Sequence, residues 1–274
     1  MKTHRIDHLT PIQKTLLITL KGRLLDSRSA NPILRDPVVT DIAHRLDYDL
    51  DTVKLGMGVP DAIAIRTAIL DRAVNAFIGA HPDAVVVELG CGLETRRFRL
   101  DPPPTVDWYD VDFPEVTALR EELLPSQNNA HLVGASLLDP GWTDTIPADR
   151  PTILVGDGIL GFLSEQQNEQ VLARITDHFA GGQLVFNAYT KIAARMTGFY
   201  TKSVGMPKEF RGFGFNDPHD VAALNPGLTF VDEQTGAAAP EREHLPPLYR
   251  LIARWFTHWP AQARRGVWVV RYRF

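Results

Sequence analysis

Short apolar runs alternate with helical patterns between about residues 61 and 190, and this rhythm dominates the chain. The runs predict strands at 83–90, 105–112, 131–135, 152–155 and 182–187. Between them, the spacing of apolar residues predicts helices at 114–124 and 164–179. Near-continuous apolar strands that alternate with helices are typical of a parallel sheet covered on both faces. We therefore expect an α/β fold with helices on both faces of a mostly parallel sheet.

The two flanks of this core have a different pattern. Residues 1–60 indicate short helices interrupted by prolines. After residue 190 the pattern predicts a helix, a Gly/Pro-rich segment at 205–218, a strand at 228–231, a helix at 248–258 and a final strand at 267–274. No linker separates the parts, so we expect one domain over 1–274. It would comprise a helical cap (1–60), a ligand-binding core (61–190), and a lid insertion with a C-terminal helix and the last strands (191–274).

Composition excludes several classes of protein. The 274 residues carry 29 Lys and Arg against 33 Asp and Glu, a net charge of −4, which does not suggest a nucleic-acid binder. The single cysteine, Cys91, excludes an intrachain disulfide and a cysteine-based zinc site. No apolar run approaches the roughly 20 residues that span a bilayer, and the N-terminus lacks a cleavage signal. We expect a cytoplasmic protein that does not enter a membrane, with no metal site.

A glycine-containing loop follows the first predicted strand, in the run Glu88-Leu-Gly-Cys-Gly-Leu-Glu94. Gly90 and Gly92 let a ligand approach the backbone closely. A dinucleotide fingerprint would require a third glycine at the position of Thr95, so that class is disfavoured. Glu88, two residues before the first glycine, favours a ligand that carries an ammonium group. Cys91, within the loop, is expected to be a small packing residue.

Two further residues complete a ligand pattern. Asp112 ends the second predicted strand, where an acid commonly binds the ribose hydroxyls of a nucleoside; alternatively it caps the helix that follows. Arg66 lies on the apolar stripe of a helix that we expect to begin with Asp61 as N-cap. A buried cation requires an anion, which would be either a core acid or a ligand carboxylate. S-adenosylmethionine carries the ammonium, carboxylate and ribose that these residues call for.

Several motifs, in this order, resemble the leucine carboxyl methyltransferase and TcmP-like polyketide O-methyltransferase family. They span about residues 9–190 and are listed here: Leu9-Thr-Pro-Ile-Gln-Lys-Thr-Leu, Asn31-Pro-Ile-Leu-Arg-Asp-Pro37, Arg66-Thr, Val87-Glu-Leu-Gly-Cys-Gly-Leu-Glu-Thr-Arg96, Trp108-Tyr-Asp-Val-Asp-Phe-Pro-Glu-Val116 and Gly156-Asp-Gly-Ile-Leu-Gly-Phe-Leu163. The resemblance implies a class I methyltransferase (Rossmann-like) fold, with six parallel strands and one antiparallel strand, that binds S-adenosylmethionine.

The resemblance also implies roles for individual residues. Arg66 matches the arginine that holds the methionine carboxylate, and Asp112 matches the ribose-binding acid. The remaining cofactor-binding positions that it implies are Glu88, Gly90, Cys91, Gly92, Phe113, Ser136, Leu137 and Asp157. Asp157 and Phe162 depart from the family pattern, which usually has glutamate and tyrosine there. The first change shortens the side chain that would reach the cofactor ammonium, and the second removes a hydroxyl that could contact the substrate. Glu94 replaces the more usual aspartate.

A basic segment follows the fifth predicted strand. Residues 191–211 contain five cations against one acid, Glu209, with aromatic residues between them. The segment is either a solvated helix and loop or a lid that attracts an anionic acceptor. If it is a lid, Lys191, Arg195, Tyr200 and Arg211 are its candidate acceptor contacts. The apolar residues of the helix at 248–258 would pack in the core or a dimer, or would form a wall of the acceptor pocket.

These observations predict an S-adenosylmethionine-dependent O-methyltransferase. No histidine or histidine–acid pair stands out as a general base, and a carboxylate acceptor needs none because it is ionised at pH 7. We therefore expect a methyl ester product on a small molecule, of polyketide type, or on a peptide, with S-adenosylhomocysteine as by-product. The alternatives are methylation of a phenol and a non-catalytic protein that binds S-adenosylmethionine. The oligomeric state is not indicated.

Overall fold

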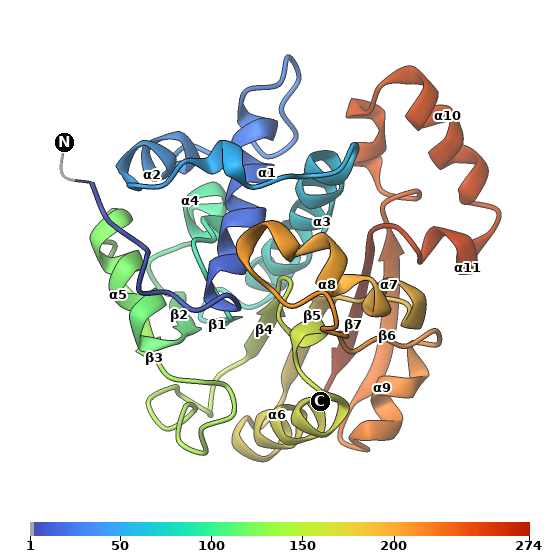
Figure 1. Ribbon diagram of the computed structural model, residues 1–274. Coiled ribbons are helices and arrows are strands. Elements are labelled where there is room, and N and C mark those ends of the chain that lie inside the picture. The colour runs from blue at the N-terminus through green and yellow to red at the C-terminus, as the bar shows by residue number, and fades with distance from the viewer. Residues whose placement is uncertain (1–2) are drawn as a thin grey trace.

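The computed structural model describes residues 3–274 and has a seven-stranded sheet at its centre (Figure 1). The strands lie in the order β3-β2-β1-β4-β5-β7-β6. Their bounds are β1 (Val85–Leu89), β2 (Asp107–Asp112), β3 (Ala130–Gly134), β4 (Thr152–Gly156), β5 (Gly182–Asn187), β6 (Thr229–Thr235) and β7 (Trp268–Arg273). β7 pairs antiparallel with both β5 and β6, and every other pairing is parallel. The expected sheet of six parallel strands and one antiparallel strand is confirmed.

Helices cover both faces of the sheet (Figure 1). Their bounds are α1 (Leu16–Ser27), α2 (Val39–Arg45), α3 (Val59–Ala80), α4 (Arg96–Leu100), α5 (Pro114–Leu123), α6 (Glu165–His178), α7 (Lys191–Arg195), α8 (Thr197–Tyr200), α9 (His219–Leu224), α10 (Pro247–Phe256) and α11 (Pro260–Ala263). Helix α3 packs its apolar side on one face of β1, β4 and β5, and α6 packs on the other. Every residue of β1 and of β4 is therefore buried, which explains why their runs are apolar apart from Glu88 and Thr152.

The start of α3 differs from the expectation. Asp61 was expected to be the N-cap, but the helix begins at Val59 after Gly58, whose φ is +77°. Pro60 fits the first turn because its missing N–H would have no partner there in any case. Asp61 therefore lies within the first turn, where its charge complements the helix dipole.

The N-terminal residues form a cap with a core of its own. Leu17, Leu20 and Leu24 of α1 are buried against residues of α2 and α5. Val204 and Met206, from the segment that follows β5, are buried in the same cluster. The cap and the segment after β5, which are far apart in sequence, therefore share one apolar cluster beside the sheet.

Strand register decides where the loops meet. Leu89 of β1 pairs with Val111 of β2 on one side and with Gly156 of β4 on the other. These strands are parallel, so the residues that follow them emerge together at one edge of the sheet. Within residues 3–274, no helix is long and apolar enough to cross a membrane.

Candidate cofactor and acceptor site

The loop after β1 adopts a conformation that requires glycine. Gly90 and Gly92 have φ values of +62° and +47°, in the left-handed region. A Cβ atom at Gly90 would lie 2.8 Å from the side chain of Ile159, and one at Gly92 would lie 3.2 Å from Leu16. The loop is thus held between the end of β4 and helix α1, with its backbone close to the neighbouring chain.

Asp112 fastens this loop to the end of β2. Its Oδ2 atom accepts a hydrogen bond from Gly92 N at 2.7 Å, and its Oδ1 atom accepts one from Phe113 N at 2.8 Å. Helix α5 has no side-chain cap, so the alternative that Asp112 caps it is wrong. Burial raises the pKa of Asp112, although the two backbone N–H groups oppose that shift. Each oxygen retains a lone pair for a further donor.

Arg66 faces an acid from the loop after β4. Its Nε atom lies 2.6 Å from Asp157 Oδ1, and Thr67 donates a hydrogen bond to Asp157 Oδ2 at 3.2 Å. Burial disfavours the charge on Arg66, but the fields of Asp157, Tyr189 and Glu94 together outweigh it, and the pKa of Arg66 is raised. The ion pair lacks hydrogen-bond geometry, and Arg66 Nε, Arg66 Nη2 and Asp157 Oδ1 are buried without a hydrogen-bond partner. The sequence left open whether Arg66 pairs with a core acid or with a ligand carboxylate, and the structure shows the acid, Asp157. The polar atoms without a partner could also bind a ligand that carries both charges.

The carboxylate of Glu88 pairs with a buried cation, the guanidinium of Arg96, at the base of the loop. Arg96 Nε donates to its Oε1 atom at 2.6 Å, and Arg96 Nη1 also donates to Asp71 at 2.6 Å. Burial raises the pKa of Glu88 to about 7, although Arg96 opposes the shift. The same two acids outweigh burial at Arg96 and raise the pKa of its guanidinium. Glu88 is thus already paired with Arg96, and it also lines the cavity described next.

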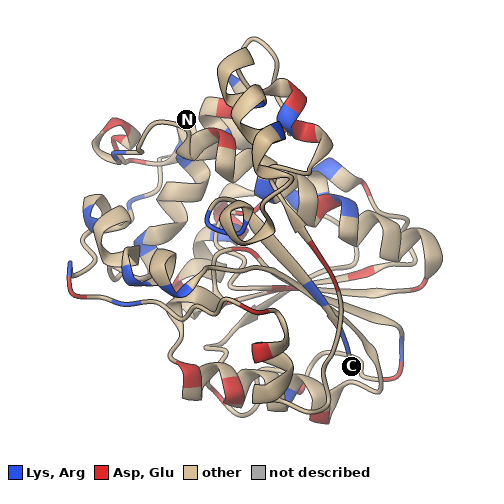
Figure 2. Ribbon diagram, turned by 90° about the vertical axis from the view of Figure 1, so that its right-hand side faces the viewer, with Lys and Arg blue, Asp and Glu red and all other residues tan. Residues whose placement is uncertain are grey.

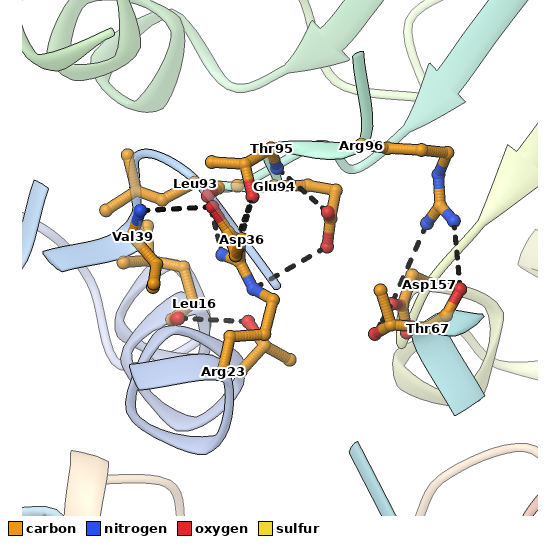
Figure 3. A network of polar contacts seen from close by, with 12 residues as sticks. Leu16, Arg23, Asp36, Val39, Thr67, Leu93, Glu94, Thr95, Arg96 and Asp157 are labelled. Atoms are coloured by element: carbon orange, nitrogen blue, oxygen red, sulfur yellow. Dashed lines mark hydrogen bonds and ion pairs between the residues drawn. The ribbon is translucent and has the colours of Figure 1, made fainter. Parts of the chain in front are cut away.

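A buried network of charges extends from this point to the N-terminal cap (Figure 3). Arg23 of α1 donates to the carbonyl oxygen of Leu93 at 2.6 Å, and its Nη1 atom lies 3.1 Å from Asp36 Oδ2. Glu94 accepts from Arg99 at 2.7 Å. Burial raises the pKa of Glu94, but the fields of Arg23 and Arg99 outweigh it and hold that pKa well below its usual range.

The sequence reading did not find this network. Its available signal was the cluster of three arginines directly after the glycine loop: Arg96, Arg97 and Arg99. Buried arginines require acids nearby. Glu88 and Glu94 are close in sequence, but Asp71 of α3 and Asp36, from the loop between α1 and α2, are brought close only by the fold.

A cavity of about 1040 Å³ opens beside the loops. We define its loop wall as the lining residues among 88–94, 112–113, 135–138 and 157–159, together with Arg66. All the expected cofactor-binding residues line this wall: Arg66, Glu88, Gly90, Cys91, Gly92, Asp112, Phe113, Ser136, Leu137 and Asp157. Cys91 is buried, and burial raises the pKa of its thiol well above the ordinary value, as suits a packing residue.

Most of the remaining lining residues, which we define as the outer wall, come from four segments. These are the lining residues among 12–19 and 52–63 of the cap and first turn of α3, 193–203 of α7 and α8 and the turn after them, and 265–268 before β7. Thr15, Thr19, Thr52, Thr197 and Thr201 supply hydroxyl groups, and apolar side chains fill most of the rest.

Figure 2 marks the positions of the cations and acids on the ribbon. Of the basic segment 191–211, only some residues line this wall. Of the four candidate acceptor contacts, Tyr200 lines the cavity. Lys191, Arg195 and Arg211 are exposed and do not line it; Arg211 instead donates to the carbonyl oxygens of Lys208 and Phe210. The sequence reading missed Lys202 as a lining cation, although it lies in the same segment.

Helix α10 stands apart from the cavity. None of its residues is buried, and none lines the cavity. Leu248, Leu251 and Trp255 are 62–67% exposed. The expectation that these side chains pack in the core, or form a wall of the acceptor pocket, is therefore wrong.

Comparisons with known proteins agree with this geometry. The sequence profile described as leucine carboxyl methyltransferase matches residues 17–176. The tetracenomycin polyketide synthesis O-methyltransferase TcmP of Streptomyces glaucescens is 32% identical over 97% of this chain and 98% of its own. The S-adenosyl-L-methionine-dependent methyltransferase dpfgK of Gibberella zeae is 27% identical over 81% of each chain.

Solved structures share the fold. A DUF574 family protein of Streptomyces avermitilis has a TM-score of 0.59 and 15% identity, over 94% of this chain and 96% of that one. A protein of Thermobifida fusca that has been provisionally assigned as a methyltransferase has a TM-score of 0.58, also at 15% identity, over 92% and 93% of the two chains.

Proposed function

Because the chain belongs to the leucine carboxyl methyltransferase family and is an S-adenosylmethionine-dependent O-methyltransferase, we propose that it converts a carboxylate of a small molecule or peptide into a methyl ester. The relative TcmP acts in the synthesis of a polyketide, which favours a small, polyketide-like acceptor. The cofactor, S-adenosylmethionine, supplies a methyl group bonded to a positively charged sulfur.

The loop wall fits the cofactor in its charges and in its hydrogen-bonding groups. Arg66 would hold its carboxylate, and Glu88 and Asp157 would hold its ammonium; buried atoms of Arg66 and Asp157 lack a hydrogen-bond partner. Asp112 would accept from the ribose hydroxyls with its remaining lone pairs. The backbone of Gly90, Cys91 and Gly92 would lie along the ligand, and Phe113, Ser136 and Leu137 would surround the adenine.

The distribution of acids and bases in the cavity carries the proposal of a carboxylate acceptor. Within residues 3–274, no histidine lines the cavity, and its lining acids all belong to the loop wall: Glu88, Glu94, Asp112 and Asp157. The outer wall therefore offers neither a histidine nor a carboxylate as a general base. A carboxylate needs none, since it is ionised at neutral pH, whereas a phenol with a pKa near 10 would.

The work of this chain is then to align and to shield the reactants. Alignment of nucleophile, methyl group and leaving sulfur can supply a large part of the rate enhancement. The loop wall fixes one partner through paired charges. The outer wall surrounds the other partner with apolar side chains and excludes water from the reacting groups.

The test is incubation of the full chain with methyl-labelled S-adenosylmethionine and an extract of the native host, followed by mass spectrometry of the labelled product. We expect a label that mild alkali releases as methanol, as an ester does. An alkali-stable label would identify a phenol ether and contradict the carboxylate proposal. Tight binding of S-adenosylhomocysteine with no labelled product would indicate a non-catalytic binding protein.

A further inference from the structure

Helix α10 presents a continuous apolar stripe to the solvent. Leu248, Leu251, Ile252 and Trp255 stand at positions i, i+3, i+4 and i+7, which share one face of a helix. All four side chains are exposed, and so is that of Trp259 just after the helix. Proteins that stay monomeric in solution rarely expose so many large apolar side chains together, so the stripe indicates an interaction surface.

The stripe lies on a projecting part of the molecule. Helix α10 packs mainly on α11 and on the 3₁₀ turn Pro240–His244, which are its neighbours in the chain. Figure 1 shows α10 at the upper right, away from the strands of the sheet. A projecting helix can enter a soft surface directly, whereas a protein partner would need a groove that fits it.

The segment that carries the stripe has charges of one sign. Residues 245–265 contain four arginines and no Asp or Glu, although the whole chain has a net charge of −4. Arg264 pairs with Glu233 at 2.6 Å, and Arg265 is exposed. The surface around α10 is therefore locally basic on a chain that is acidic overall, which favours a partner of negative charge.

The two arginines of α10 itself share a single acid. Arg250 and Arg254 lie 3.4 and 3.1 Å from Glu243, and Arg242 lies 3.4 Å from the same carboxylate. One carboxylate does not neutralise three guanidinium groups, so positive charge remains in excess. At about 100° per residue, Arg250 and Arg254 lie on the side of α10 away from the apolar stripe.

This arrangement fits a lipid surface better than a protein. Helices that lie flat on membranes have Trp, Phe or Leu on one side and arginine or lysine on the other. Tryptophan and tyrosine are enriched where acyl chains meet headgroups, and Tyr249, Trp255 and Trp259 are all exposed here. A symmetric contact between two copies of α10 would instead bring two basic segments together.

We propose that α10 binds the surface of a membrane that contains anionic phospholipids. The apolar stripe lies among the acyl chains, and Arg250 and Arg254 lie at the level of the phosphate groups. The helix has ten residues, which is half of what a membrane-spanning helix needs, so it rests along the surface. The proposal concerns where the protein binds and is independent of the identity of the methyl acceptor.

The test adds lipid vesicles to the full chain and follows tryptophan emission. Trp108, Trp142 and Trp268 are buried, so a change on binding reports the two exposed tryptophans, Trp255 and Trp259. We expect a blue shift with vesicles of equimolar phosphatidylcholine and phosphatidylglycerol, and none with phosphatidylcholine alone. The shift should diminish as salt is added, because salt screens the attraction between arginines and phosphates.

Flotation with the same anionic vesicles measures the affinities of two double variants. Leu251→Ser/Trp255→Ser should weaken binding at least tenfold, because it removes two large apolar side chains from the stripe. Arg250→Gln/Arg254→Gln should weaken binding about twentyfold, since each arginine near an anionic surface contributes about fivefold in affinity. Unchanged affinity for S-adenosylhomocysteine checks that each variant is folded.

Two further double variants are matched controls from other parts of the surface. Ile192→Ser/Val231→Ser removes exposed apolar side chains, and Arg28→Gln/Lys208→Gln removes exposed cations. None of these four residues lines the cavity. Both controls should bind the anionic vesicles like the parent, within about twofold.

Several results would overturn the proposal. These are the absence of binding to the anionic vesicles, equal binding to both kinds of vesicle, or equal losses in the α10 variants and the controls. Light scattering after size-exclusion chromatography covers the alternative of a second copy. A parent dimer that Leu251→Ser/Trp255→Ser converts to a monomer, with no vesicle binding by the parent, would assign the stripe to an interface between copies instead.

Discussion

The two walls of the cavity use charge in opposite ways. On the loop wall, Glu88 is paired with Arg96, and Arg66 is paired with Asp157, all in buried surroundings. On the outer wall, Lys202 and Arg265 are exposed and have no partner among the described residues. Buried charges are expensive unless paired, so the loop wall is built around its charges. The outer wall does not depend on its charges for folding, which leaves them available to a ligand.

The largest expected effect tests whether the loop wall depends on its ion pairs. Arg96→Met leaves Glu88 and Asp71 without their common cation, and breaking a buried pair costs about 3–5 kcal/mol of unfolding free energy. Arg265→Met, on the outer wall, should change that free energy by less than about 0.5 kcal/mol. Urea unfolding of the parent and both variants measures the difference. Similar values for the two variants would remove the contrast between the walls.

The pH dependence of stability tests the cost of a buried charge at one residue of the loop wall, Glu88. Burial raises the pKa of Glu88 from the ordinary 4.5 to about 7, so the folded state holds this proton more tightly than the unfolded state between those values. The contribution of Glu88 to stability is therefore fully present below pH 4.5 and is lost as pH rises through 7, by up to about 3 kcal/mol.

Glu88→Gln removes this titration and serves as the reference. Urea unfolding at pH 5, 6, 7 and 8 should show that the unfolding free energy of the parent falls relative to that of the variant as the pH rises. In the parent, affinity for S-adenosylhomocysteine should rise over the same interval, because the ionised carboxylate attracts the ammonium group. Parallel stability curves for parent and variant would mean that Arg96 keeps Glu88 ionised throughout.

Removal of single charges from the loop wall should also weaken binding of the cofactor. Arg66→Ala and Asp112→Ala should each weaken binding of S-adenosylhomocysteine by about ten- to a hundredfold, since charged hydrogen bonds contribute about 1.5–3 kcal/mol. Isothermal titration calorimetry measures the affinities, with Lys208→Ala as the matched surface control. A variant that binds like the parent would disprove the role assigned to its residue.

The smallest effect concerns backbone shape. Gly58 and Gly90 both have positive φ, but a Cβ at Gly58 meets nothing within 4 Å, whereas one at Gly90 would lie 2.8 Å from Ile159. Gly58→Ala should cost only the left-handed strain, about 1–2 kcal/mol. Gly90→Ala should cost more and should also weaken binding of S-adenosylhomocysteine. Equal stability losses with unchanged affinity would show that the loop tolerates a side chain.

Much of the core could be predicted because its signals are local. The strand over 182–187 and the helix at 114–124 follow from apolar period and proline position, and the structure has them at Gly182–Asn187 and Pro114–Leu123. The pattern failed at α10, where a strongly amphipathic stretch suggested burial, yet the helix is exposed. Periodicity reports which face of a helix is apolar and says nothing of what that face meets.

The sequence by itself determined the residues of the loop wall. Apart from Arg66 of α3, they lie at the end of a strand or directly after it, as Asp112 and Gly90 do, and parallel register brings such positions to one edge. Only the tertiary structure decided their partners, because Arg96 meets Asp71 and Arg23 meets Leu93 across separations of 25 and 70 residues. It likewise decided which cations of the basic segment face the cavity, since that depends on how Val204 packs against the N-terminal cap. Local pattern fixes the type and place of an element along the chain, whereas long-range packing fixes which side chains meet.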